Sequence, residues 1–270
     1  MLDRSTRRLI EALKKRIMIL SAVSLVLAIA FCVMTVLYIT KGCDHETIEE
    51  TSSLNSNTVS NLALDKTESE TIPAVKIDDW NLRLVNSKKP LPNGFTVKTE
   101  KIAASYARDV GMLFDSRAVS YLNAMCAAAE KDGINLLVIS SFRTNARQTV
   151  LYNNQVTKQK ANYPEKSEEE IKKIAATISA YPGTSEHEVG LAVDFNSVET
   201  SFENTPHFQW LKTHAAEYGF VLRYPEEKQD ITGVIYEPWH YRYVGENHAK
   251  KMNQLGYCLE EYIDYLNNSK

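Results

Sequence analysis

The sequence predicts an α+β fold: a small, mostly antiparallel sheet with flanking helices, preceded by a membrane anchor and a tether. Amphipathic helical patterns come first in the C-terminal two thirds of the chain, and short apolar runs suited to buried strands then cluster around motifs rich in His and carboxylates. Near the N-terminus an uncharged apolar segment is followed by a polar stretch. The 270 residues therefore leave roughly 190 for one globular domain, enough for a sizeable core.

Residues 17–40 predict a transmembrane signal anchor. They contain no charged side chain, and as a helix they would span about 36 Å, enough to cross a hydrocarbon core about 30 Å thick. Residues 1–16 carry six basic residues against two acidic ones, which predicts a cytoplasmic tail and a single-pass topology with the rest of the chain outside the cell membrane. A cleaved signal peptide and a lipoprotein anchor at Cys43 are the alternatives, but the apolar run is long for a signal peptide.

Residues 41–79 predict a disordered extracytoplasmic linker. From residue 44 to residue 79 there is no aromatic residue and no Gly, and ten of the 25 residues at 47–71 are Ser or Thr. Such a composition cannot bury enough apolar surface to offset the entropy lost on ordering. The globular domain is accordingly predicted at residues 80–270.

The elements of this domain follow from caps, breakers and periodicity. Asp115 or Ser116 can cap a first helix that ends before Gly133, and Ser167 with Glu170 forms the capping box of a second. Thr205 with a Pro after it opens a third. The predicted elements are helices at 115–131, 167–180 and 205–219, strands at 134–140, 189–195, 220–224 and 233–236, and a broken helix at 246–266.

The four cysteines do not form a disulfide framework. Cys32 lies in the apolar segment and Cys43 just after it, whereas Cys126 and Cys258 lie in the globular domain. The latter two are either bridged or two buried free thiols. Neither pair has the short spacing of a zinc–thiolate site.

The segment Ser185-Glu-His-Glu-Val-Gly-Leu-Ala-Val-Asp194 offers one imidazole and one carboxylate as metal ligands. A lone histidine such as His187 is more often a hydrogen-bonded structural residue than a metal ligand. Asp194, however, stands at the end of a predicted buried strand, where a carboxylate is costly unless a cation meets it.

The segment Glu237-Pro-Trp-His240 offers a second imidazole and a spare carboxylate. Pro238 prevents a regular helix, so Glu237 and His240 should project from an extended or turn segment. The alternative is an aromatic edge strand in which Glu237 pairs with Arg242. Two imidazoles and a carboxylate would leave a tetrahedral zinc ion one open position, and Glu237 could take a proton there.

Other functional classes find no support. The domain has no basic patch and no phosphate-binding loop, so no nucleic-acid partner is predicted. His207 and His214 are expected to be structural, and His248 to lie on an exposed helix.

Taken together, the two motifs resemble those of the VanY-type zinc D-alanyl-D-alanine carboxypeptidases of bacteria. The resemblance runs from about Trp80 to Gly245 and includes Ser140-Ser-Phe-Arg-Thr144 with Gln148, and the Tyr218–Pro225 segment that leads to Ile231-Thr-Gly. It implies removal of the terminal D-alanine from pentapeptide stems of peptidoglycan, with one Zn²⁺ per chain.

The resemblance also implies a role for each site residue. It makes His187, Asp194 and His240 the zinc ligands, and Glu237 and Arg143 the catalytic residues. It places Ser185, Gln148 and Trp239 around the substrate. Phe142 departs from the family, which often has Tyr there. An L,D-carboxypeptidase acting on tetrapeptide stems and a non-catalytic cell-wall-binding module remain as alternatives, although a binding module has no need of Glu237.

Overall fold

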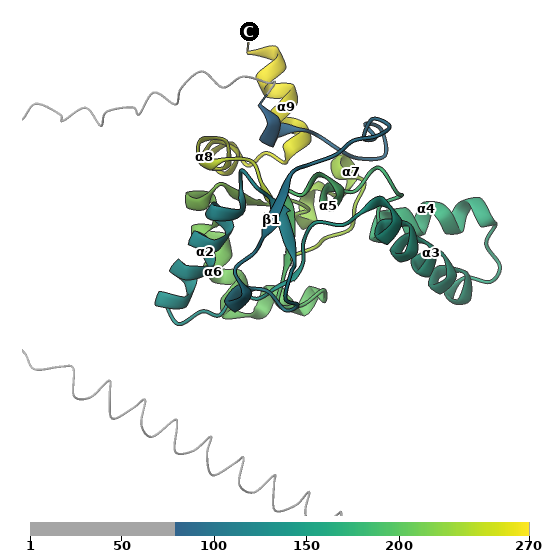
Figure 1. The fold of residues 1–270 in the computed structure, drawn as a ribbon. Coiled ribbons are helices and arrows are strands. Elements are labelled where there is room, and N and C mark those ends of the chain that lie inside the picture. Colours follow the sequence, from purple (N-terminus) through teal and green to yellow (C-terminus); the bar gives the residue numbers. More distant parts are fainter. Residues whose placement is uncertain (1–78, 270) are drawn as a thin grey trace, which may run out of the picture. The chain divides into compact units, whose positions relative to one another are not determined.

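The computed structural model describes residues 79–269, which are coloured in Figure 1. The predicted cytoplasmic tail, the signal anchor and all but one residue of the predicted linker lie outside the described residues. Within the described range, no helix is both long and apolar enough to cross a membrane. Asp79, the first described residue, already contacts the domain, because its Oδ2 lies 3.3 Å from Nε2 of the buried His248.

A four-stranded antiparallel sheet forms the centre of the domain, and the predicted α+β class is confirmed for the described residues. Its strands in spatial order are β3 (Val138–Ser140), β4 (Ala192–Phe195), β6 (His240–Tyr243) and β5 (Phe220–Leu222). A second, two-stranded sheet pairs β1 (Thr99–Lys101) with β2 (Leu113–Asp115). All residues of the central strands β4 and β6 are buried, so each polar side chain on them requires a partner inside the protein.

The register of the two central strands brings two predicted metal ligands together. In the β4–β6 pair, Asp194 lies directly opposite His240. Directly opposed residues of an antiparallel pair have Cβ atoms only about 4.5–5.5 Å apart. On the other side of β4, Asp194 pairs with Ser140 of β3. Backbone pairing thus fixes the position of Asp194 from both sides.

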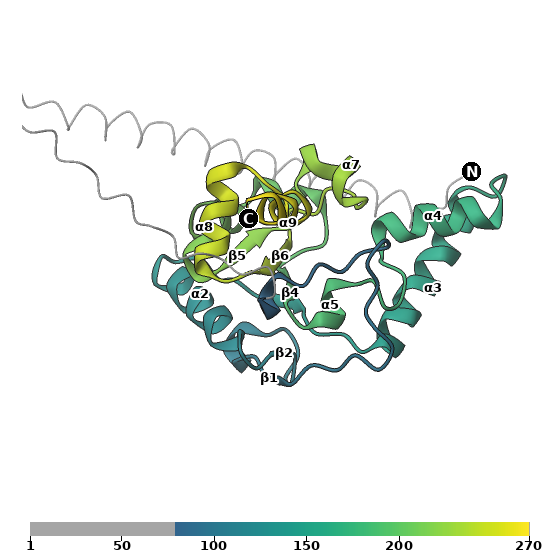
Figure 2. The same cartoon turned by 90° about the horizontal axis from the view of Figure 1, so that it is seen from above.

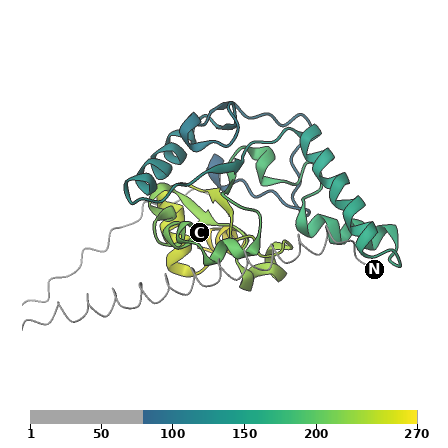
Figure 3. The same cartoon turned by 90° about the horizontal axis from the view of Figure 1, so that it is seen from below.

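Helices flank this sheet, and most of the apolar core lies between them and the strands. They are α2 (Val119–Lys131), α3 (Asn145–Asn162), α4 (Glu168–Ile178), α5 (Glu186–Val189), α6 (Pro206–His214), α7 (Gln229–Thr232), α8 (Glu246–Leu255) and α9 (Leu259–Asn268). Leu122 and Met125 of α2 are fully buried, and each such side chain contributes about 1.5–3 kcal/mol. The paired helices α3 and α4 stand out from one end of the domain (Figures 2 and 3), whereas α8 and α9 lie near β5 (Figure 2).

Several predicted elements are confirmed in their detail. Helix α2 ends before Gly133, as predicted, and Gly133 has a left-handed conformation. Ser167 and Glu170 form the capping box of α4, and the side chain of Thr205 caps α6. The C-terminal helix is broken at Gly256, as expected. Cys126 and Cys258 are buried free thiols, which decides between the two alternatives for this pair.

Other predictions are wrong. The first helix begins at Val119 because Asp115 belongs to β2, where its carboxylate accepts hydrogen bonds from the backbone and side chain of Arg117. Residues 233–236 form no strand and follow α7 as a bend and irregular backbone. His248 is not exposed: its ring is buried against the hydroxyl of Tyr262. The sequence pattern predicted no element at the positions of helix α3 and strands β1 and β2.

Candidate active site

A single helical turn, α5, holds the first imidazole. Ser185 accepts a hydrogen bond from the His187 backbone, and Glu188 accepts one from the Ser185 backbone, so a reciprocal capping box closes the N-terminal end of the turn. Gly190 ends it with φ of +80°, a conformation that a β-carbon would strain. The predicted strand at 189–195 therefore begins only at Ala192, because this turn precedes it.

The proton position on His187 follows from its partner. Nδ1 of His187 lies 2.8 Å from the carbonyl oxygen of Ser141. A carbonyl can only accept, so Nδ1 carries the hydrogen and Nε2 keeps a free lone pair. Nε2 faces Asp194 Oδ2 at 3.3 Å.

His187, Asp194 and His240 converge on one point, as predicted. One ligand atom from each lies within 4.8 Å of the other two, and all three residues are buried. Nδ1 of His240 lies 3.0 Å from Asp194 Oδ1, and the two imidazole rings are nearly perpendicular, with an interplanar angle of 88°. Two nitrogens and one carboxylate oxygen form the donor set of a catalytic zinc site.

An unpaired oxygen shows that this point suits a cation. Asp194 Oδ1 is buried and, although Nδ1 of His240 lies 3.0 Å away, it accepts no well-aligned hydrogen bond from the described residues. A buried carboxylate oxygen without a partner costs free energy, and a bound cation would remove that cost. The donor set and the unpaired oxygen therefore fit a divalent metal ion.

The groups around His187, Asp194 and His240, called the triad below, shift the pKa values of the two histidines in opposite directions. Burial and the nearby Arg143 lower the pKa of His187 to about 4, so this ring stays neutral. Burial also opposes protonation of His240, but the carboxylates of Asp194, Glu186 and Glu237 outweigh it and raise the pKa of His240 to about 9. The same negative charges that attract a proton to His240 would also attract a divalent cation, which could replace that proton.

Glu237 supplies the spare carboxylate that the sequence predicted. Its Oε2 lies 3.5 Å from Nδ1 of His240, and the segment is a turn closed by the hydrogen bond from the His240 backbone to the Glu237 carbonyl. Burial raises the pKa of Glu237 to about 8. A carboxyl group with a raised pKa beside the triad can accept and return a proton near neutral pH.

Arg143 lies on the other side of Asp194. Its Nη2 contacts Asp194 Oδ2 at 3.1 Å and Ser140 Oγ at 2.7 Å, and its Nη1 donates to Gln148 Oε1 at 3.2 Å. Gln148 is fully buried and also donates to the Ala180 carbonyl at 2.7 Å. Gln148 thus holds Arg143 from behind and does not line the cleft, contrary to the prediction.

A cleft of about 420 Å³ opens onto the triad. Helices α3 and α4 contribute one wall, through residues such as Leu151 and Ile178, and the segment Val234–Ile235 contributes to another. Ser185, Glu237 and Trp239 also line the cleft, so the predictions for Ser185 and Trp239 as cleft residues agree with the geometry.

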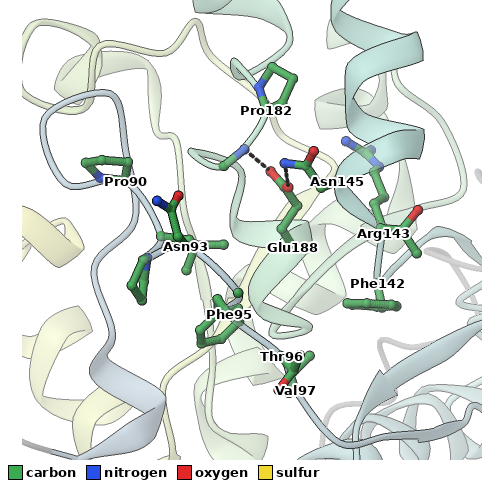
Figure 4. A pocket seen from close by; sticks show the side chains of 15 residues that line it. Pro90, Asn93, Phe95, Thr96, Val97, Phe142, Arg143, Asn145, Pro182 and Glu188 are labelled. Atoms are coloured by element: carbon green, nitrogen blue, oxygen red, sulfur yellow. Dashed lines mark hydrogen bonds between the residues drawn. The ribbon is translucent and has the colours of Figure 1, made fainter.

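A second, larger cavity of about 740 Å³ shares Arg143 with the cleft (Figure 4). The carboxylate of Glu188 in its wall is already bound by Asn145 Nδ2 at 3.0 Å and the Gly183 backbone at 2.8 Å, the two dashed bonds of Figure 4. Most of its lining is apolar or carries neutral polar groups. The reactive groups therefore gather in the smaller cleft.

Sequence reasoning missed the charged residues behind the triad. Arg242 does not pair with Glu237, because its Nη1 lies 3.0 Å from Glu186 Oε1. Arg223 also contacts Glu186, at 2.7 Å, and all three side chains are buried. An arginine between aromatic residues in a short strand was a signal for a buried partner, but nothing in the sequence identified Glu186 as that partner.

Comparison with known proteins identifies the family. The family profile described as "VanY: D-alanyl-D-alanine carboxypeptidase" matches residues 111–246, half of the chain. The chain belongs to the VanY family. A VanY-family relative, the D-alanyl-D-alanine carboxypeptidase of Enterococcus faecalis, is 38% identical over 186 residues, which is 69% of this chain and 66% of the relative. The putative carboxypeptidase YodJ of Bacillus subtilis is 36% identical over 200 residues, covering 68% of this chain and 67% of YodJ. The chain thus spans about two thirds of the length of these curated relatives.

Solved structures of related carboxypeptidases share the fold of the described domain. VanYB in complex with D-alanine-D-alanine is 39% identical, with a TM-score of 0.61, and the match covers 69% of this chain and 98% of that one. A VanY mutant in complex with Zn(II) is 38% identical, with a TM-score of 0.60, and the match covers 68% and 99%. The LD-carboxypeptidase LdcB is 33% identical, with a TM-score of 0.59, and the match covers 67% and 84%.

Proposed function

We propose that this chain is a zinc metallopeptidase that removes the terminal D-alanine from the pentapeptide stems of peptidoglycan. The observation that carries the proposal is the convergence of His187, Asp194 and His240 with Glu237 beside them in one cleft. Similarity to VanYB, which was solved with D-alanine-D-alanine, supports the substrate class.

His187, Asp194 and His240 would hold one zinc ion, the first through Nε2 and the last through Nδ1. Bound zinc would supply a Lewis acid that polarises the scissile carbonyl and lowers the pKa of water. The protein's contribution is the fixed triad: backbone pairing holds Asp194 opposite His240, and Ser141 orients His187.

Glu237 would move the proton. As water attacks the carbonyl carbon of the penultimate D-alanine, the Glu237 carboxylate accepts a proton from that water. The C–N bond then breaks, and Glu237 returns the proton to the amine of the departing D-alanine. Its raised pKa suits both directions, because a group of much lower pKa would accept the proton poorly and a group of much higher pKa would return it poorly.

Arg143 would bind negative charge in the cleft. Its contacts with Ser140, Gln148 and Asp194 use four of its five N–H groups, which leaves one for the substrate. This group can stabilise the oxyanion that forms during attack, or bind a carboxylate of the peptide.

An L,D-carboxypeptidase is the second candidate, because LdcB shares the fold at 33% identity. The two activities differ in the stem that is cut: a pentapeptide for the D,D enzyme and a tetrapeptide for the L,D enzyme. A non-catalytic wall-binding module is disfavoured by Glu237, whose buried carboxyl beside the triad has no use in binding alone.

The test is amino-acid release from synthetic pentapeptide and tetrapeptide stems, with and without a zinc chelator. We expect chelator-sensitive release of D-alanine from the pentapeptide. Release from the tetrapeptide alone would establish the L,D activity instead. Stoichiometric zinc without release from either stem would refute both activities.

We also propose that the domain works on the outer side of the cell membrane, held there by residues 17–40 and a linker at 41–79. The uncharged apolar run and the basic residues before it support this topology. External protease added to intact cells whose wall has been removed should degrade the domain while sparing residues 1–16. Protection of the domain from the protease would contradict the proposal.

A further inference from the structure

A buried carboxylate, Glu186, lies behind His240, on the side away from Asp194. Its side chain is fully buried, and its Oε1 accepts a hydrogen bond from Arg223 Nε at 2.7 Å. Nη1 of Arg242 lies 3.0 Å from the same oxygen. Two guanidinium groups on one oxygen offset the cost of burying this charge.

The other oxygen of Glu186 faces the metal ligand. Oε2 lies 3.9 Å from Nε2 of His240. Both atoms are buried, and neither makes a hydrogen bond with the described residues. A buried polar atom left without a partner is costly, so a hydrogen bond between these two atoms would satisfy both at once.

This contact would determine which nitrogen of His240 binds metal. Neutral imidazole has one N–H and one lone pair. If Nε2 donates its hydrogen to Glu186, the lone pair lies on Nδ1, the nitrogen that faces Asp194 Oδ1 at 3.0 Å. His187 has the opposite arrangement, because its Nδ1 donates to Ser141.

The C-terminal helix continues this chain of contacts. Glu260 of α9 binds Arg223 through both oxygens, with distances of 2.7 Å and 2.8 Å. Such a bidentate pair fixes the orientation of a guanidinium group. Helix α9 lies outside residues 111–246, the part that matches the family profile, yet three side chains connect it to His240.

We propose that Glu186 is a positioning residue that orients His240 and places its proton on Nε2, and that Glu260 acts through Arg223 to hold Glu186 in place. The inference rests on the proposed zinc site. It assigns to α9 a role in metal binding that a purely structural helix would not have.

The first test measures zinc affinity and the absorption spectrum of the Co²⁺-loaded protein, using the full-length chain in detergent. Glu260→Gln should weaken zinc binding about three- to tenfold, and Glu186→Gln about 10–100-fold, the usual range for partners of a metal-binding histidine. The cobalt spectrum should change in both variants because the geometry of a ligand changes.

Glu261→Gln is the matched control. Glu261 is the next residue of α9 and has its own ion pair, with Lys228 Nζ at 2.9 Å. It also accepts a hydrogen bond from the Cys258 backbone, so this variant reports on loss of helix stability alone. Equal effects of Glu260→Gln and Glu261→Gln on zinc affinity and the cobalt spectrum, or no effect of either, would overturn the role of Glu260.

The second test needs no variant of the network. Long-range ¹H–¹⁵N spectra of the zinc-loaded chain should place the proton of His240 on Nε2 and that of His187 on Nδ1. A proton on Nδ1 of His240 would overturn the role of Glu186 even if no variant folded. His187→Ala distinguishes failure of the two proposals. If the parent chain binds no more zinc than this variant, the zinc site itself is refuted. If the parent chain binds zinc and the Glu186→Gln and Glu260→Gln variants bind it equally well, only the positioning role is refuted.

Discussion

Replacing Glu237 by Gln should separate metal binding from proton transfer. The change keeps the volume of the side chain in its buried position but removes the carboxylate that faces Nδ1 of His240 in the cleft and can accept a proton there. General acid–base catalysis contributes about 10²–10⁴-fold. This range corresponds to about 3–5.5 kcal/mol in the free energy of activation.

Zinc binding should survive this change, because the three converging ligand atoms come from His187, Asp194 and His240 alone. The assay is D-alanine release from the pentapeptide stem, together with zinc content by mass spectrometry of the metal. A variant that retains more than a tenth of parental kcat, or that loses its zinc, would refute the role given to Glu237.

Three further predictions follow from the site and the packing. His187→Ala should lose zinc and activity together, as measured by metal content and D-alanine release; a fully zinc-loaded variant would contradict the ligand role. Gly219→Ala should lower the free energy of unfolding in urea by about 2–4 kcal/mol, since its β-carbon would lie 2.8 Å from Tyr243 at φ of +83°. Gly256→Ala, with φ of +65° but open space around it, should lower it by only about 1–2 kcal/mol, and equal losses would argue against the clash. Burial lowers the pKa of His248, so the neutral ring contributes to stability above about pH 6.5, and this contribution is lost as the pH falls further. His248→Gln should therefore reduce the difference in the free energy of unfolding in urea between pH 5 and pH 7.5.

The chemistry of the site could be predicted from the sequence because its residue types are informative by themselves. His187, Asp194, His240 and Glu237 are the donors and the base that a zinc hydrolase needs, and the structure brings them together. Their spatial relation could not be predicted. Pro238 suggested only a turn, and nothing in the sequence indicated that His240 begins a central strand opposite Asp194.

The failed predictions share a physical cause, since each depended on a partner distant in the sequence. Asp115 resembled a helix cap, but it ends a strand, where it pairs with Thr99 of β1 and its backbone N–H donates to the Gly190 carbonyl. His248 resembled a surface residue on a polar helix, but α9 and Asp79 cover it. Gln148 was assigned to the cleft wall, but it points to Arg143 and the Ala180 carbonyl.

The pairing of Asp194 with His240 has a consequence for the order of events in folding. The two residues lie far apart along the chain and meet only through the β4–β6 register, so an unfolded chain contains no assembled zinc site. Contacts between distant segments form late, after the entropy of closing the intervening loop has been lost. Zinc should therefore leave the refolding rate unchanged and slow unfolding, because it binds only after the sheet has formed.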